Sequence, residues 1–286
     1  IMSIAASELV INEDGTIYHL GLHPDQLYPT VITVGDPGRV ERLSRRFDRV
    51  DYRIQKREFV THGGKLGNKD IMVISTGIGT DNVDIVLNEI DALANIDFTT
   101  QMIKENHTSL DIMRVGTSGT ILPHIEVDSI ILSKGSIGLD GLMHFYQREK
   151  LKEEIELLTW DIRWPIPPYF NYGSPILFEK YKNIGIPGIT VSNTGFYGPQ
   201  GRTLRLNPTE KNLFDQLSGK SIGGSPITNL EMETSGLYGL CELLGHHCLS
   251  VNVILANRPN GKFSRDPYQS VEKMIDVVFE AITQDA

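Results

Sequence analysis

The chain has 286 residues, of which 40% are hydrophobic and 22% are charged, and its formal net charge is -9. This length and composition indicate a globular α/β domain and exclude an intrinsically disordered chain. The acidic balance, without any basic run, excludes nucleic acid and anionic membranes as expected partners. No apolar stretch approaches the ~20 residues of a membrane span.

Short runs rich in Val and Ile predict buried strands, because they lack the alternation of half-exposed strands. In chain order they are residues 31–34, 71–75, 112–115, 129–132, 189–192 and 249–255. Apolar residues at three- and four-residue steps predict helices within 83–93, 237–244 and 271–282. Ser270 is the predicted N-cap of the last helix. This alternation predicts a single α/β domain over residues 1–286, with a mixed, mostly parallel central sheet flanked by helices.

Residues 149–188 depart from the alternating pattern. They begin with a charged helical stretch and continue into the proline-rich Trp164–Pro168. We expect an insertion or flap over the sheet edge.

The segment Thr33–Arg39 predicts a strand end, a glycine turn at Gly35 and a helix start. Such a turn presents backbone N–H groups to an anion, and Arg39 adds a guanidinium suited to bidentate contact. An ordinary turn with a surface arginine explains the same residues equally well. The spacing matches neither a dinucleotide nor a Walker motif. The similar turn at Ser75–Gly79 is predicted to serve close strand–helix packing.

Arg114 lies within a predicted buried strand, where a charge requires an anionic partner. Gly116–Gly119 follows at the expected strand end, the edge at which α/β sheets bind ligands, and Thr117 adds a hydroxyl there. These residues predict an anion site. A structural pair between Arg114 and a carboxylate is the alternative.

The loop after residues 189–192 carries three side chains suited to a flat heterocycle. Phe196 can stack on a ring, Gln200 offers a donor and an acceptor, and Arg202 offers donors only. This set fits uracil, which has a ring N–H and two carbonyl groups. A solvated Gly/Pro loop is the alternative.

Two further segments add polar groups. Glu231 and Glu233 open a predicted helix and can face one site only if the entry to that helix is extended; otherwise they are helix N-terminal acids. Arg258, after the last predicted strand, is placed to polarise a substrate carbonyl, unless it is a surface residue.

The sequence does not predict a metal site, since His246 and His247 are adjacent and no other His/Cys cluster has zinc spacing. Cys241 and Cys248 are too few for a disulfide framework. They indicate core positions and a reducing, cytoplasmic compartment.

In this order the motifs resemble the nucleoside phosphorylase-I family and, within it, the uridine phosphorylases. The resemblance runs from Ile17–Leu22 to the final helix and is weak over residues 149–188. It implies a nucleoside phosphorylase fold, no cofactor, and phosphate as co-substrate. It also implies a homodimer as the minimum unit, with a hexamer as a further expectation.

The resemblance assigns individual residues to the part of the substrates that they bind. Phosphate binding is assigned to Gly35, Arg39, Arg114, Thr117 and, from the neighbouring subunit, Arg57. Ribose binding is assigned to Glu231, Met232, Glu233 and, from the neighbouring subunit, His19. Uracil binding is assigned to Phe196, Gln200, Arg202 and Arg258.

The implied activity is phosphorolysis of uridine to uracil and ribose 1-phosphate, through an oxocarbenium-like transition state. A purine phosphorylase, a nucleosidase of the same fold and a non-catalytic nucleoside-binding protein are the alternatives. Purine members carry an Asp where this chain has Asn257, which favours a pyrimidine. Positions matching Glu58, Ile78 and Asn82 hold a monovalent cation in some members, but Asn82 replaces a Ser, so no ion is assigned.

Overall fold

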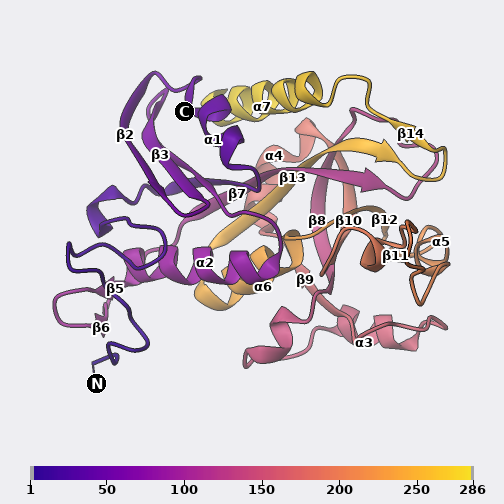
Figure 1. The fold of residues 1–286 in the computed structure, drawn as a ribbon, viewed down its shortest axis with the longest axis horizontal. Helices are drawn as coiled ribbons and strands as arrows, with labels where there is room; N and C mark the ends of the chain where they lie inside the picture. The colour runs from indigo at the N-terminus through magenta and orange to yellow at the C-terminus, as the bar shows by residue number, and fades with distance from the viewer. Residues whose placement is uncertain (1–2, 285–286) are drawn as a thin grey trace.

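The computed structural model describes residues 3–284 (Figure 1). The α-helices are α1 Pro37–Ser44, α2 Thr80–Asn95, α3 Lys152–Thr159, α4 Pro175–Tyr181, α5 Leu213–Leu217, α6 Thr234–Leu244 and α7 Pro267–Gln284. The strands are β1 Thr30–Val34, β2 Arg49–Lys56, β3 Phe59–Leu66, β4 Lys69–Ser75, β5 Ile96–Asp97, β6 Met102–Ile103, β7 Asp111–Thr120, β8 Ile130–Leu139, β9 Tyr169–Tyr172, β10 Ile186–Asn193, β11 Ser221–Ile222, β12 Ser225–Glu231, β13 His247–Asn257 and β14 Lys262–Phe263. Short 3-10 helices cover Pro24–Gln26, Leu142–Phe145, Lys182–Ile184 and Gly198–Gln200.

One large sheet organises the chain, in the order β11-β12-β10-β8-β13-β7-β1-β4-β3-β2, with β9 beside β8 and β14 beside β13. Parallel pairing joins β4, β1, β7 and β13 in one group and β8, β10 and β12 in another. The groups meet where β13 pairs with β8 and the end of β7 pairs with β12, both antiparallel. This last pairing closes five strands into a ring. The predicted mixed α/β fold with flanking helices is confirmed.

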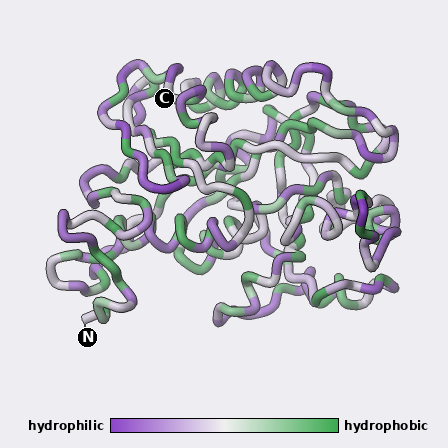
Figure 2. The backbone as a smooth tube through the Cα atoms, viewed as in Figure 1, coloured by the Kyte–Doolittle hydropathy of each residue, from purple (hydrophilic) through white to green (hydrophobic). Residues whose placement is uncertain are grey.

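Helices cover both faces of the sheet. In Figure 1, α1 and α7 lie on one side and α2 and α6 on the other. Alternate residues of β1 point to opposite faces, so Val31 packs under α2 and α6 while Ile32 packs with α1, α4 and α7. Figure 2 shows the accompanying pattern, in which α7 alternates between hydrophobic and hydrophilic residues along its length.

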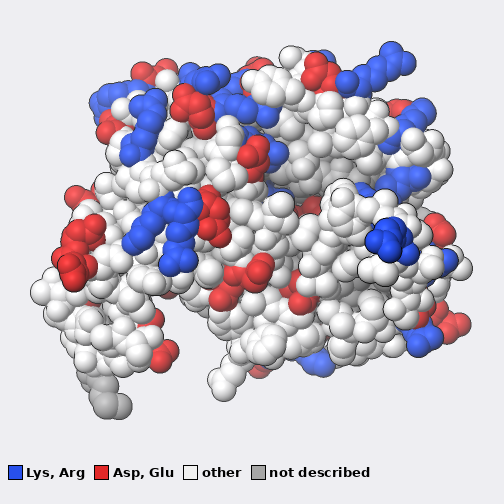
Figure 3. Space-filling view, in the orientation of Figure 1, with Lys and Arg blue, Asp and Glu red and all other residues white. Residues whose placement is uncertain are grey.

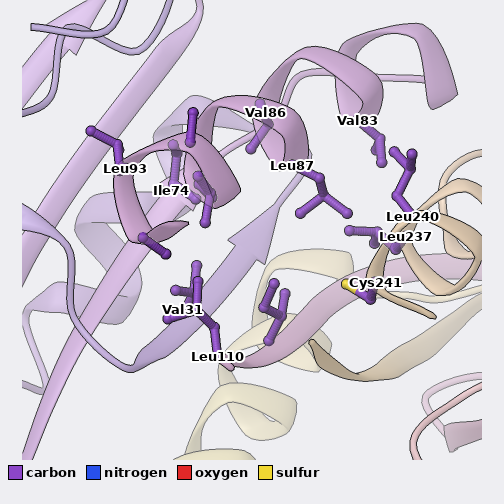
Figure 4. Packing of buried hydrophobic residues seen from close by; sticks show 14 of the residues in the cluster. Val31, Ile74, Val83, Val86, Leu87, Leu93, Leu110, Leu237, Leu240 and Cys241 are labelled. Atoms are coloured by element: carbon purple, nitrogen blue, oxygen red, sulfur yellow. The ribbon is translucent and has the colours of Figure 1, made fainter. Parts of the chain in front are cut away.

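The core between α2 and α6 explains why these two segments form helices. Val83 and Leu87 of α2 face Leu237 and Leu240 of α6 (Figure 4), and Val86 belongs to the same buried cluster. Cys241 and Cys248 are buried free thiols, as the sequence predicts. This packing fixes the N-terminal ends of both helices beside the carboxyl ends of the strands.

Several strands were absent from the sequence prediction. β2 and β3 form a hairpin, and the burial of β2 alternates residue by residue. Its Val50, Tyr52 and Ile54 alternate with polar residues, a period of two that signals a half-exposed strand. β12 was also missed, and it carries the segment that leads into α6.

Two local predictions were wrong. Ser270 is not the N-cap of the last helix, because α7 begins at Pro267 and the Asp266 carboxylate accepts a hydrogen bond from the Gln269 N–H. Gly116–Gly119 does not follow a strand end, because β7 continues to Thr120. Its last residues, Gly119 and Thr120, pair with β13 on one side and β12 on the other, and these two ladders extend the strand.

Residues 149–188 divide into two parts. The first contains α3, whose buried Glu154 pairs with Arg148 at 2.6 Å and accepts a hydrogen bond from the Phe170 N–H of β9 at 3.5 Å. The second supplies β9, which pairs with β8, then α4 and the beginning of β10.

Within residues 3–284 no helix has the length and apolar character needed to cross a membrane. Figure 3 shows basic and acidic side chains interspersed on the face in view.

Candidate active site

A cavity of about 670 Å³ opens where the ends of strands from both groups converge. Its walls come from the residues after β1, β4 and β10, from the second half of β7, and from the ends of β12 and β13. Ten of the predicted site residues line it: Gly35, Arg39, Arg114, Thr117, Phe196, Gln200, Arg202, Glu231, Met232 and Glu233. The structure therefore brings together residues nearly 200 positions apart in the chain.

The turn after β1 has the predicted form. Asp36 is the N-cap of α1 and its carboxylate accepts a hydrogen bond from the Gly38 N–H at 2.9 Å. Arg39 is buried in the first turn of α1, and its Nη1 donates to the Val115 carbonyl at 3.2 Å. The guanidinium is thus directed from α1 onto β7.

Arg114 is buried and paired with the two carboxylates that follow β12. Its Nε donates to Glu231 at 3.2 Å and its Nη2 donates to Glu233 at 2.5 Å. Glu233 and Glu231 raise the pKa of Arg114 against the lowering effect of burial, and burial raises the pKa of Glu231 against the effect of Arg114. A structural pair between Arg114 and a carboxylate was the alternative to the predicted anion site. The structure contains such pairing, and the paired residues line the same cavity.

Two buried N–H groups of the cavity remain unpaired, namely Arg39 Nε and Arg114 Nη1, which have no hydrogen-bond partner among the described residues. Burial, followed by repulsion from Arg114, lowers the pKa of Arg39 to about 10. Two neighbouring buried guanidinium groups with unpaired donors are suited to bind an anion. We refer to them below as the unpaired arginine donors.

Gly116 makes room for the Arg114 guanidinium. A Cβ at Gly116 would lie 2.9 Å from Arg114 Cζ and 2.6 Å from the side-chain oxygen Oδ1 of Asn252. Any side chain here would displace the guanidinium, so the glycine determines where this arginine lies. Thr117, the next residue, lines the cavity from β7.

The second glycine turn does more than the packing predicted for it. Gly77 and Ile78 line the cavity, and Gly79 donates its N–H to Glu233 Oε1 at 2.9 Å. Gly77 and Gly79 have φ values of 75° and 96°, which favour glycine. Glu233 is the N-cap residue of α6, and β12 ends at Glu231. Both carboxylates therefore precede the first turn of α6, Glu231 at the end of β12 and Glu233 at the N-cap, and both line the cavity.

The heterocycle-binding set lies at the other end of the cavity. Arg202 places its guanidinium 3.8 Å from the centre of the Phe196 ring and donates from Nη1 to Gln200 Oε1 at 2.5 Å. Burial, followed by repulsion from Arg258, lowers the pKa of Arg202 to about 10. One face of the Phe196 ring, the side chain expected to stack on a base, is covered by Arg202.

Arg258 does not occupy the predicted position. It is not among the described residues that line the cavity; it donates to the Gln200 carbonyl and lies 5.7 Å from the Phe214 ring centre. It supports the loop that carries Gln200. Asn257 points away as well, since its amide donates to the carbonyls of Leu122, Pro123 and Ile125.

His19 and Arg57, the two residues assigned to a neighbouring subunit, lie together outside the set that lines the cavity in the described chain. Arg57 is exposed, with its guanidinium 5.7 Å from the Tyr18 ring centre, and Tyr18 packs edge-on against His19. His19 Nδ1 lies 2.6 Å from Glu89, and the His19 side chain is 30% exposed.

Other lining residues were not predicted from the sequence. They include Asp36, Pro37, Glu58, Ser118, Leu255 and Phe263. Asp36, Pro37 and Ser118 lie within motifs that the sequence analysis identified. Their position next to predicted site residues could therefore have indicated that they line the cavity. Phe263 belongs to β14, which folds back on β13.

The comparisons with known proteins agree with this geometry. A family model described as the phosphorylase superfamily matches residues 29–283. The chain belongs to this superfamily. The resemblance identified from the sequence is thereby confirmed.

Individual phosphorylases match over most of the chain. A uridine phosphorylase of Thermococcus kodakarensis is 29% identical over 93% of this chain and 86% of its own length. One from Escherichia coli is 28% identical over 93% and 96%. A Trypanosoma brucei nucleoside phosphorylase that shows uridine phosphorylase activity superposes with a TM-score of 0.88 at 27% identity, covering 97% of this chain and all of the other.

A second cavity of this phosphorylase, about 940 Å³, adjoins the first, and Arg202 lines both. Its other walls include Leu204 and Leu206, both strongly exposed, and Ile166 of the segment after α3. The side chain of Arg202 therefore lies between the two cavities.

Away from this site, Asp91, His107 and His246 lie within 4.8 Å of one another. His246 Nδ1 accepts a hydrogen bond from the Leu110 N–H, so the neutral ring carries its proton on Nε2, which lies 3.1 Å from Asp91. A ring nitrogen that carries a proton has no lone pair for a metal. This cluster is therefore a histidine–carboxylate contact between α2 and the short connection from α6 to β13.

Proposed function

We propose that this chain catalyses the phosphorolysis of uridine, giving uracil and ribose 1-phosphate. The observation that carries the proposal is the pair of unpaired arginine donors beside Glu233, in one cavity with Gln200 and Arg202. An anion site, a carboxylate for sugar hydroxyls and an amide–guanidinium set for a base are the three parts that a nucleoside phosphorylase needs. The names of the matching relatives support the choice of uridine.

The proposed reaction is a displacement at C1′ of the ribose. A phosphate oxygen forms the new C1′–O bond while the C1′–N1 bond breaks, and the bonding electrons pass to uracil, which then takes a proton from solvent. Phosphate on Arg39 and Arg114 stabilises the positive charge of the ribose. Gln200 and Arg202 stabilise the negative charge that builds on uracil, a contribution of ~3–4 kcal/mol for a well-placed donor.

Glu233 is the proposed acceptor for the sugar hydroxyls, beside the backbone of Met232. Phosphate is a co-substrate in this scheme, and neither a cofactor nor a metal is required. The two buried free thiols support a reducing, cytoplasmic location. We also infer that residues 1–286 form one domain. The insertion expected over residues 149–188 is narrowed to residues 149–168, because residues 169–188 supply β9, α4 and the start of β10.

The minimum active unit is proposed to be a homodimer. Arg57 and His19 each lie near the Tyr18 ring, outside the described cavity lining, and Arg57 is exposed. An exposed arginine on a surface shared with Tyr18 is available to complete the anion site of a second copy.

Uracil release from uridine, with and without phosphate, tests the reaction. We expect release that depends on phosphate or arsenate, and a much slower reaction with inosine. Undiminished release in rigorously phosphate-free buffer would identify a nucleosidase. Inosine as the better substrate would identify a purine phosphorylase, and tight uridine binding without turnover would identify a binding protein.

A mixed dimer tests the shared site. If Arg57→Ala and Arg202→Ala are each nearly inactive, co-refolding equal amounts gives one intact site in each heterodimer, hence about a quarter of all sites by random pairing. Activity that rises toward this value supports the dimer. If subunit exchange is verified by mass and activity does not recover, Arg57 does not act in a neighbour's site.

A further inference from the structure

The two carboxylates of the candidate site differ in how many hydrogen bonds they can still accept. Glu231 accepts from four donors: Ser192 Oγ, Arg114 Nε, and the backbone N–H groups of Glu233 and Thr234, the last shared by both oxygens. A carboxylate has about four lone-pair sites. Glu231 is therefore saturated by the protein and has no capacity for a sugar hydroxyl.

Glu233 is in a different state. Among the described residues it accepts from two donors, Gly79 N–H at Oε1 and Arg114 Nη2 at Oε2. Each oxygen keeps about one lone-pair site. Both carboxylates are buried and both line the cavity, so burial does not distinguish them. They differ in the number of lone-pair sites left to accept a hydrogen bond from a ligand.

The four donors of Glu231 come from three separate elements. Ser192 belongs to β10 and donates at 2.5 Å, Arg114 belongs to β7, and the two N–H groups are those at the start of α6. Ser192 also accepts a hydrogen bond from the Ser235 N–H at 2.9 Å. Glu231 thus ties β10 and α6 to one edge of the Arg114 guanidinium.

This tie decides which part of Arg114 remains available. Glu231 holds Nε and Glu233 holds Nη2, which leaves Nη1 as one of the unpaired arginine donors. Without Glu231 the planar guanidinium loses the contact that fixes its rotation about the Nε end. The direction of Nη1 then becomes variable.

We propose that Glu231 is a positioning residue for phosphate binding through Arg114 and that it does not bind the ribose, which Glu233 alone serves. The inference rests on the proposed phosphorolysis, and it reassigns one residue that the sequence placed on the sugar. Ser192 contributes to the same positioning, because its hydroxyl on β10 donates a hydrogen bond to Glu231.

Removing hydroxyl groups from the substrate separates the two roles. Steady-state kinetics are measured for Glu231→Gln and Glu233→Gln with uridine, 2′-deoxyuridine and 3′-deoxyuridine, each over a range of phosphate concentrations. A residue that binds a hydroxyl loses its effect when that hydroxyl is absent, as in a double-mutant cycle. A residue that positions Arg114 keeps its effect with all three substrates.

For Glu231→Gln we expect the half-saturating phosphate concentration to rise by about tenfold, the usual order for a lost charged hydrogen bond. The ratio of kcat/KM for uridine to that for each deoxy analogue should stay within about twofold of wild type. For Glu233→Gln, this ratio should instead fall far below its wild-type value. The proposal is overturned if Glu231→Gln lowers the ratio selectively, or if it leaves phosphate saturation unchanged.

Ser192→Ala provides a milder change if Glu231→Gln does not fold. It removes one donor and keeps the charge of Glu231, so phosphate saturation should weaken by a few-fold with the substrate ratio unchanged. Thr228→Val is the matched control, because Thr228 is a buried, hydrogen-bonded residue of β12 that donates to Ile189 and Asn229 instead. An equal effect of Thr228→Val and Ser192→Ala would overturn the proposal. Failure of the proposed function itself would be recognised separately, as wild-type protein without phosphate-dependent uracil release.

Discussion

Replacing Arg39 with methionine is expected to stabilise the phosphate-free protein while it abolishes phosphate binding. Arg39 is 9% exposed, makes one hydrogen bond to the Val115 carbonyl, and lies beside Arg114. Its buried charge is therefore only partly compensated. Methionine keeps much of the apolar stem and removes the charge.

The magnitude follows from the pKa of Arg39, which burial and then repulsion from Arg114 lower from its ordinary value to about 10. For a base, a lower pKa in the folded state means that the charged form opposes folding, here by about 3 kcal/mol. The penalty is complete below pH 10 and disappears as the pH rises toward the ordinary pKa of arginine. Loss of the Val115 hydrogen bond offsets about 1 kcal/mol of the gain. A net gain of about 1–2 kcal/mol corresponds to roughly 2–6 °C in Tm.

Thermal unfolding followed by circular dichroism, at fixed protein concentration in phosphate-free buffer near neutral pH, measures this effect. Arg42→Met is the matched control on the same helix, because Arg42 is paired with Glu272 at 2.5 Å and lies over the Tyr268 ring, so its loss should lower Tm. Saturating phosphate should raise the Tm of wild type but not that of Arg39→Met. The reasoning is refuted if Arg39→Met melts as low as Arg42→Met, or if phosphate stabilises it as much as wild type.

Three further substitutions test other parts of the site. Arg202→Ala should lower kcat/KM for uridine by about 10²–10³ with little change in phosphate saturation; full activity would show that Arg202 does not contact the base. Gly116→Ala should displace the Arg114 guanidinium and weaken phosphate binding by about tenfold or more in a titration, whereas unchanged binding would place Arg114 outside the anion site. Asn257→Asp should lower the free energy of unfolding by about 3 kcal/mol in urea, because a carboxylate would face three carbonyls. Asn260→Asp, the same change at an exposed position, should have a small effect, and equal losses would contradict this account.

The helices and strands that are apolar and buried could be predicted from the sequence. The strands that form only because other strands pair with them could not. β1, β4 and α2 carry continuous or periodic apolar runs that identify them without context. β12 is different, because Ser225–Glu231 contains Pro226, Thr228 and Asn229. It is a strand because β10, β7 and β11 pair with it, and pairing between distant segments leaves no local signal.

The candidate site was predictable as a set of residues but not as a set of contacts. Motif order selected ten residues that line one cavity. The pairing of Arg114 with Glu231 and Glu233, 117 and 119 positions away, depends on the closing contact of β7 with β12. Arg258 was misplaced for the same reason, since only the tertiary structure shows its guanidinium held by the Gln200 carbonyl.

The charges around the proposed sugar and phosphate positions favour a second subunit. Arg39 and Arg114 carry two positive charges and Glu231 and Glu233 two negative ones, so these four buried side chains sum to zero. A phosphate dianion placed among these four side chains meets no net positive charge from them, so it retains much of its desolvation cost. The oxocarbenium charge of the ribose offsets that cost only in the transition state, so it strengthens catalysis and does not help phosphate to bind. Binding in the ground state therefore requires a further cation. Arg57 is exposed beside Tyr18 and carries a charge of the required sign, so the charge balance of one chain gives a physical reason why two copies should share a site.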